Sequence, residues 1–247
     1  MTSPRHSHSE CRPADITALD PHRASVAVMQ PYFFPYVGYF RLLAAAETFV
    51  IFDDVQFPRR GRVHRCEVPG PHGALEWLTL PLARQPRETL IKDIVFTAGA
   101  RDILDQRLKR LCWLADARGP WADRVRAHLY RPLDNLVGFL EAGLRLVAEA
   151  LDLRPRIVRS SSFAVDPHLC GQDRVIALVH RLGGRTYVNA PGGRALYQDE
   201  AFSRAGLELK FLVPFAGSGC SILPALVTDV NNALKAQFHH RLLSPYR

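Results

Sequence analysis

Short apolar runs alternate along the chain with longer stretches of periodic polarity. Residues 25–29 and 48–52 are apolar over most of their length, as expected for strands covered on both faces, and residues 186–189 are also predicted to form a strand. From about residue 100 to 151, apolar positions instead recur every three or four residues, which predicts amphipathic helices. This alternation predicts an α/β fold with a mostly parallel sheet, flanking helices and a helical middle segment.

A β-hairpin is expected near the first quarter of the chain. Residues 63–68 and 77–81 are strand-like, and the turn formers Pro69-Gly70-Pro71-His72-Gly73 lie between them. Further strands are predicted at 91–96, 156–158 and 207–211, and further helices at 37–46, 172–182, 194–204 and 221–234.

The hydropathy pattern divides the chain into three parts. Residues 1–25 are rich in His, Pro, Ser and Asp and are predicted to form a disordered leader. Its His6, His8 and Cys11 are metal-ligating residue types, but an unstructured tail is the favoured interpretation. A single α/β domain is expected over 26–235, with the helical insertion at about 100–151, and a tail over 236–247.

Composition narrows the class of protein. Of the 247 residues, 47% are hydrophobic and 23% charged, which is typical of a globular protein. No apolar run approaches the roughly 20 residues of a membrane helix, and the first 25 residues lack the apolar segment of a signal peptide. The five cysteines contain no CxxC pair, which disfavours a disulfide framework and a structural zinc site. A cytoplasmic protein without a membrane partner is expected.

The net charge of +8 suits an anionic partner, and the alternative is that a GC-rich coding sequence accounts for the many Arg residues without any ligand. Of the 32 basic residues only four are Lys, and no run of five or more basic residues occurs. Arg suits bidentate contacts with phosphate or carboxylate. A phosphate-bearing small molecule or an acidic carrier protein is therefore favoured over DNA or RNA.

Three polar loops each follow an apolar strand: MQPYFFPY, DDVQF and NAPGG. In an open α/β sheet, ligands bind outside the carboxyl ends of the strands. If the three strands are parallel neighbours, their loops converge on one site.

Asp53 and Asp54 are the candidate catalytic residues of the DDVQF loop. A carboxylate there would act as general base towards an amine or hydroxyl, or would hold a divalent cation, with Gln56 as a neutral neighbour. Adjacent side chains at a strand end point in different directions, so one acid would face the site while the other anchors the loop. A pair of loop-capping acids is the alternative.

Two weaker patterns remain open. Gly192 and Gly193 would expose backbone N–H groups to a phosphate or carboxylate, although no P-loop or GxGxxG motif is present; a tight turn is the alternative. Cys66 lies two residues from His64 on a predicted strand and is a candidate nucleophile, with a half-buried thiol on a hairpin as the favoured alternative. Cys220, followed by Ser221, is a second, weaker candidate.

Several of these motifs together resemble the WbqC-like family. VMQPYFFPYVGYFRLL, FVIFDDVQFPRRG, WLTLPL and YVNAPGGRALY occur in order, and the resemblance runs from about Val26 to about Thr228. The family usually carries an Asn- and Arg-rich stretch after DDVQF, whereas this chain has Val63-His64-Arg65-Cys66-Glu67. The resemblance implies a role in the biosynthesis of O-antigen, other surface polysaccharides or natural products. The implied chemistry is transfer of an acyl or aminoacyl group to the amine of a sugar or related intermediate.

The transferase hypothesis assigns one role to the two acids and another to a group of substrate-binding residues. Asp53 or Asp54 would deprotonate the amine, and a nucleotide-sugar or thioester would be the small-molecule substrate. The hypothesis requires no cofactor, and a divalent cation held by Asp53 and Asp54 is the alternative. The alternative is a non-catalytic protein that binds a pathway intermediate or an acyl-carrier protein. The candidate substrate-binding residues are Gln30, Tyr32, Tyr39, Gln56, Arg59, Arg65, Tyr187, Asn189, Gly192 and Gly193, with Arg60 as a further phosphate contact.

Overall fold

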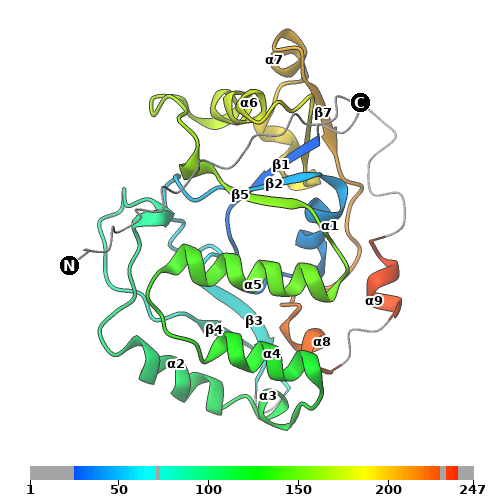
Figure 1. The fold of residues 1–247 in the computed structure, drawn as a ribbon. Helices are drawn as coiled ribbons and strands as arrows, with labels where there is room; N and C mark the ends of the chain where they lie inside the picture. The colour runs from blue at the N-terminus through cyan, green and yellow to red at the C-terminus, as the bar shows by residue number, and fades with distance from the viewer. Residues whose placement is uncertain (1–24, 71–72, 229–231, 239–247) are drawn as a thin grey trace, which may run out of the picture.

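A five-stranded parallel sheet forms the centre of the molecule (Figure 1). The computed structural model describes residues 25–70, 73–228 and 232–238. The strand order is β5-β2-β1-β6-β7, and every neighbouring pair is parallel. The strands are β1 (Ser25–Met29), β2 (Thr48–Ile51), β5 (Arg156–Arg159), β6 (Thr186–Asn189) and β7 (Glu208–Phe211). The predicted α/β class with a parallel sheet is confirmed.

Helices cover both faces of this sheet, which explains why the inner strands β1 and β2 are mostly apolar, whereas the edge strands β5 and β7 carry charged residues. Val26, Val28 and Val50 pack with α6 (Gly171–Arg181) and α7 (Asp199–Arg204) on one face. Alternate strand residues, including Ala27, Phe49 and Ile51, belong to the core on the other face, with α1 (Val37–Ala45) and α5 (Leu136–Ala150). In Figure 1, α6 and α7 lie above the sheet and α1 and α5 below it.

A second layer continues below α5 (Figure 1). It contains the predicted hairpin, formed by β3 (Arg65–Pro69) and β4 (Leu75–Thr79), which buries Cys66, Val68 and Leu78 in the shared core. The middle segment is helical as predicted. The remaining helices of this layer are α2 (Ala100–Lys109), α3 (Cys112–Asp116), α4 (Pro120–Leu129) and α8 (Leu223–Thr228), while α9 (Asn232–Ala236) lies beside the end of α5 (Figure 1).

The strand predicted at 91–96 is wrong. Ile91–Asp93 forms a 3₁₀ helix, η1, and isolated bridges flank it, Leu90 with Gln56 and Phe96 with Leu82. Its backbone instead closes the DDVQF loop, because the N–H of Lys92 donates to the Asp53 carbonyl at 2.8 Å. The apolar residues Ile91 and Ile94 are buried from this irregular backbone, so their burial does not require a strand.

Two helices differ from the predicted ones near the C-terminal end. The helix predicted at 194–204 divides into a 3₁₀ helix, η3 (Pro191–Leu196), and α7. The helix predicted at 221–234 starts at Leu223 as α8. The leader, apart from Ser25, and most of the predicted tail lie outside the described residues, as does the metal-binding alternative at His6, His8 and Cys11.

The chain changes direction across the sheet at β1. β2 and β5 extend the sheet on one side of β1, and the chain then crosses to the other side for β6 and β7. The crevice outside the carboxyl ends of β1 and β6 is therefore the topological switch point, where α/β sheets bind ligands. None of the helices described here is both long and apolar enough to span a bilayer.

Candidate functional site

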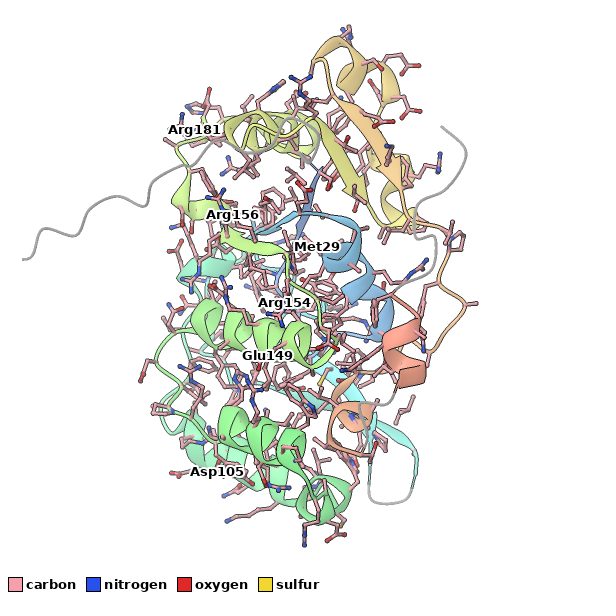
Figure 2. The ribbon with its side chains drawn as sticks, turned by 45° about the vertical axis from the view of Figure 1, so that its right-hand side comes forward. Met29, Asp105, Glu149, Arg154, Arg156 and Arg181 are labelled. Atoms are coloured by element: carbon pink, nitrogen blue, oxygen red, sulfur yellow. The ribbon has the colours of Figure 1, made fainter. Side chains whose placement is uncertain are left out.

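A cavity of about 630 Å³ lies at this switch point. The ends of β1, β2 and β6 all contribute to it: Met29 and Gln30, Phe52, and Asn189 with the following glycines. Figure 2 labels Met29, the last residue of β1. The three strands are parallel neighbours, and the loops after β1 and β6 line the cavity, whereas the DDVQF loop contributes only through Phe52, the residue that precedes it. We call this cavity the switch-point pocket.

The pocket is lined by aromatic rings and by side-chain amides. Its rings come from Tyr36, Phe52, Tyr197 and Phe215. No Asp, Glu, Lys, Arg or His is among the described residues that line it. Such a lining suits an uncharged ring with several hydrogen-bonding groups.

Gln30 is positioned by the helix that follows its loop. Tyr39 is buried in α1 and donates its hydroxyl to the Gln30 backbone carbonyl at 2.8 Å. Pro31 follows and cannot continue the strand ladder, so the chain leaves the sheet here. Within the described structure the Gln30 side-chain amide has no hydrogen-bond partner. It is therefore available to a ligand.

Asn189 ends β6 with a fixed amide orientation. Its Oδ1 accepts the Ala190 N–H at 2.8 Å, and its backbone carbonyl accepts the Leu212 N–H at 2.9 Å. The side chain is buried, and a Cβ added to Gly193 would overlap its Nδ2. Glycine at 193 thus allows the amide nitrogen of Asn189 to pack against the backbone at the pocket wall.

Tyr197 enters the pocket from the end of η3. Its hydroxyl lies 3.1 Å from the hydroxyl of Tyr187, which is fully buried in β6. The two rings meet edge to face at 5.3 Å, and Phe202 stacks on Tyr187 at 5.5 Å. Burial, followed by the neighbouring Tyr197, raises the pKa of Tyr187 well above its usual value. Tyr187 therefore keeps its proton, and it supports the pocket without lining it.

Asp53 and Asp54 lie in a buried cluster on the side of β2 that faces β5. Asp53 accepts bonds from the Ser161 N–H at 3.0 Å and the Ser161 hydroxyl at 2.7 Å. The Ser160 hydroxyl lies 3.0 Å from an oxygen of Asp53 and 2.5 Å from one of Asp54. Arg174 of α6 pairs with Asp54 at 2.5 Å. These contacts tie the β2 loop to the β5 loop and to α6.

This arrangement is that of loop-anchoring acids, the alternative raised from the sequence. Neither acid lines the switch-point pocket, and Asp53 is only 1% exposed. Its partners are hydrogen-bond donors, and Arg174 already supplies a positive charge to Asp54, so the cluster does not fit a divalent cation. A metal-binding group of three or more His, Cys, Asp or Glu is also absent from the described ranges. The catalytic assignment of these acids stays a prediction.

The other predicted polar contacts lie away from the pocket lining. Gln56 donates to the Arg87 carbonyl at 2.9 Å, and Arg59 donates to the Gln85 carbonyl at 2.8 Å beside a smaller cavity of about 190 Å³. Arg65 lies over the Trp77 ring at 4.2 Å. It also donates to the Arg60 carbonyl at 2.6 Å. Tyr32 packs on Tyr39 at 5.3 Å. These side chains stabilise loops and the hairpin.

Burial opposes a nucleophilic role for Cys66. The thiol is 1% exposed, and burial raises its pKa to about 12, so it is protonated near neutral pH. The pKa of His64 is lowered by burial and then by Arg65, and its ring packs against Phe57 at 5.2 Å. Cys220 is half-buried, and Ser221 uses its hydroxyl to donate to the Phe34 carbonyl at 2.7 Å.

Only some of the site residues predicted from the sequence line the switch-point pocket. Gln30, Asn189, Gly192 and Gly193 line it together. Tyr36 and Tyr197 also line it and were missed, although both lie inside the quoted motifs. Phe215 was missed as well, because its loop shows no periodicity that would mark it.

Comparison with known proteins identifies one family. Residues 30–216 match the model of the WbqC-like protein family. A protein of Mycobacterium tuberculosis (strain ATCC 25618 / H37Rv), named "Uncharacterized protein Rv1507c", is 23% identical over 190 residues, covering 74% of this chain and 80% of that protein. No solved structure matches the chain.

Proposed function

The chain belongs to the WbqC-like protein family, and from that premise we propose that it is a transferase acting at the switch-point pocket. Its acceptor is the amine of a sugar or natural-product intermediate, and the transferred group is acyl or aminoacyl. A nucleotide-sugar is one substrate of this kind, and a thioester is the acyl donor.

The observation that carries the proposal is the lining of the pocket. A volume of about 630 Å³ is within the range of small-molecule sites. The aromatic rings supply apolar faces for a sugar ring, while Gln30 and Asn189 supply amides for its polar groups. The position outside β1 and β6 is where folds of this class bind substrates.

The chemistry needs few groups from the protein. The lone pair of the amine attacks the carbonyl carbon of the thioester, the C–N bond forms and the C–S bond breaks. The proton lost from nitrogen passes to the departing thiolate. With Asp53 and Asp54 engaged by Ser160, Ser161 and Arg174, the protein's contribution in this proposal is orientation of the two reactants.

A thermal-shift screen tests this proposal. The purified protein is heated with nucleotide-sugars, acyl-coenzyme A compounds, nucleoside triphosphates with Mg²⁺, or a short oligonucleotide. A ligand at 100 times its dissociation constant adds about 2.7 kcal/mol to the free energy of unfolding. We expect nucleotide-sugars or thioesters, and none of the other compounds, to raise the melting temperature. Gln30→Ala should reduce this shift because Gln30 lines the pocket. Gln106→Ala, at an exposed glutamine of α2, is the matched control and should keep it. A shift with the oligonucleotide alone would contradict the proposal.

One observation favours the second candidate, a binding protein without catalytic activity. The described lining of the pocket contains no titratable acid or base other than tyrosine. Mass spectrometry of mixtures of the screened acceptor and donor separates the two functions. An acylated product that forms only with the protein supports the transferase, whereas tight binding without product supports the binding protein.

A further inference from the structure

Two hydrogen-bond donors meet in the switch-point pocket, and neither has an acceptor among the residues that the structure describes. We propose that the Tyr197 hydroxyl and Asn189 Nδ2 form a two-donor site for the carbonyl oxygen of an acyl group, with Tyr187 orienting the first donor. This inference rests on the proposed function and names the part of the substrate that these residues hold.

The first step concerns the direction of the Tyr187–Tyr197 bond. Each hydroxyl has one proton, and the two oxygens are 3.1 Å apart. Tyr187 is fully buried, and no other acceptor for its hydroxyl exists in the described structure. If Tyr197 donated, a buried proton on Tyr187 would stay unpaired, which is unfavourable because that hydroxyl has lost its water. Tyr187 therefore donates, and the Tyr197 proton is left for the pocket.

The second step concerns the amide of Asn189. Its Oδ1 is occupied by the Ala190 N–H at 2.8 Å, which settles which end of the amide is oxygen. Nδ2 has no acceptor in the part of the chain that is described. Asn189 is among the buried polar residues, so its orientation is fixed before a ligand arrives. Preorganised donors of this kind are effective in stabilising an oxygen that gains charge.

The third step places the two donors together. The position that a Cβ would take on Gly193 overlaps Asn189 Nδ2 and is 3.5 Å from Tyr197 Cε2. The Asn189 amide nitrogen and the edge of the Tyr197 ring therefore lie side by side against Gly193, at the wall of the pocket. Because no described Lys or Arg lines the pocket, the site suits a neutral carbonyl better than a carboxylate or phosphate.

Calorimetric titration with two matched sugars tests the inference. N-acetylglucosamine is a simple acylated aminosugar, and its N-thioacetyl analogue replaces the carbonyl oxygen with a larger sulfur that accepts hydrogen bonds weakly. We expect the wild-type protein to bind the oxygen compound about 10-fold more tightly, since each lost hydrogen bond is worth about 0.5–1.5 kcal/mol. Tyr197→Phe and Asn189→Ala should each reduce this preference several-fold.

Tyr187→Phe separates positioning from a structural role. Loss of its donated proton should reduce the preference for oxygen over sulfur, while a purely structural defect would weaken both sugars equally. Tyr130→Phe, at an exposed tyrosine that does not line the pocket, is the matched control and should keep the wild-type preference. Equal binding of the two sugars by the wild-type protein overturns this inference and leaves the proposed function standing. Binding of neither sugar overturns both.

Discussion

His128 is buried in the helical layer between aromatic rings. Its imidazole stacks on Phe139 at 4.5 Å and meets Phe34 edge-on at 5.6 Å, and its Nε2 is buried without a partner in the described structure. Burial, followed by the charge of Arg131, lowers the pKa of His128 to about 4. In the unfolded chain the pKa returns to about 6.5, so the unfolded state binds more protons between these values.

Stability should therefore fall as the pH falls from 6.5 towards 4. The loss from His128 is about 2 kcal/mol at pH 5 relative to pH 7, at 1.36 kcal/mol per pKa unit. Urea denaturation at both pH values checks this in the wild-type protein and in His128→Leu. We expect the variant to lose less stability on acidification, with the contribution of His64 common to both proteins. An identical loss in the two proteins would contradict the burial of a neutral imidazole.

The nearly buried ion pair between Asp54 and Arg174 is expected to stabilise the fold. Both side chains are nearly buried, and Arg174 Nε is already without a partner among the described atoms. Asp54→Asn leaves a buried cation uncompensated and should lower the free energy of unfolding by about 3–5 kcal/mol. The double variant Asp54→Asn/Arg174→Met should recover part of the loss in the same urea experiment. Unchanged stability with abolished turnover in Asp54→Asn would instead support Asp54 as the general base.

At the scale of elements, the end of β6 packs closely against η3 at Gly193. A Cβ there would overlap the buried amide of Asn189, whereas a Cβ on Gly192 would meet no atom within 4 Å. Gly193→Ala should therefore cost about 1–3 kcal/mol of stability through overpacking. Gly192→Ala should be neutral or slightly stabilising. Thermal denaturation of the two variants side by side checks the contrast, and equal midpoints would contradict the packing described here.

The elements that could be predicted from sequence are those with a dominant burial pattern. Apolar runs such as 48–52 are buried on both faces, and α5 has a continuous apolar stripe, so both were predicted correctly. Residues 91–96 were misassigned because Ile91 and Ile94 are buried from a 3₁₀ turn. The local hydropathy pattern indicates that a residue is buried, but it does not show whether that residue lies in a strand, a helix or a turn.

The same limit applies to the candidate site. The loops after β1, β2 and β6 were expected to converge, because parallel strands end at one edge of a sheet. The direction of each side chain was not accessible from sequence. Asp53 and Asp54 turn towards β5 and α6, while Tyr36 and Tyr197 line the pocket. These directions depend on long-range contacts such as that between Ser161 and Asp53.

At the scale of the whole molecule, the switch-point pocket joins segments distant in sequence. The loops after β1, β2 and β6 meet the segment around Phe215, which follows β7. Arg41 of α1 supports that segment by donating to the Val213 carbonyl at 2.9 Å, with its guanidinium 5.8 Å from the Phe215 ring. Ligand binding should therefore respond to changes in any of the four segments.

Filling the pocket tests the central claim that it is the ligand site. Gly192 lines the pocket, and a side chain built on it meets no atom within 4 Å at its Cβ, so Gly192→Phe should occupy the space without disturbing the fold. Leu75→Phe, at an exposed position of β4, is the matched control. The measurement is calorimetric titration of N-acetylglucosamine into the wild-type protein and both variants. We expect Gly192→Phe to lose binding at an unchanged melting temperature while Leu75→Phe binds as the wild type does. Wild-type affinity in Gly192→Phe would contradict the account and place the ligand elsewhere.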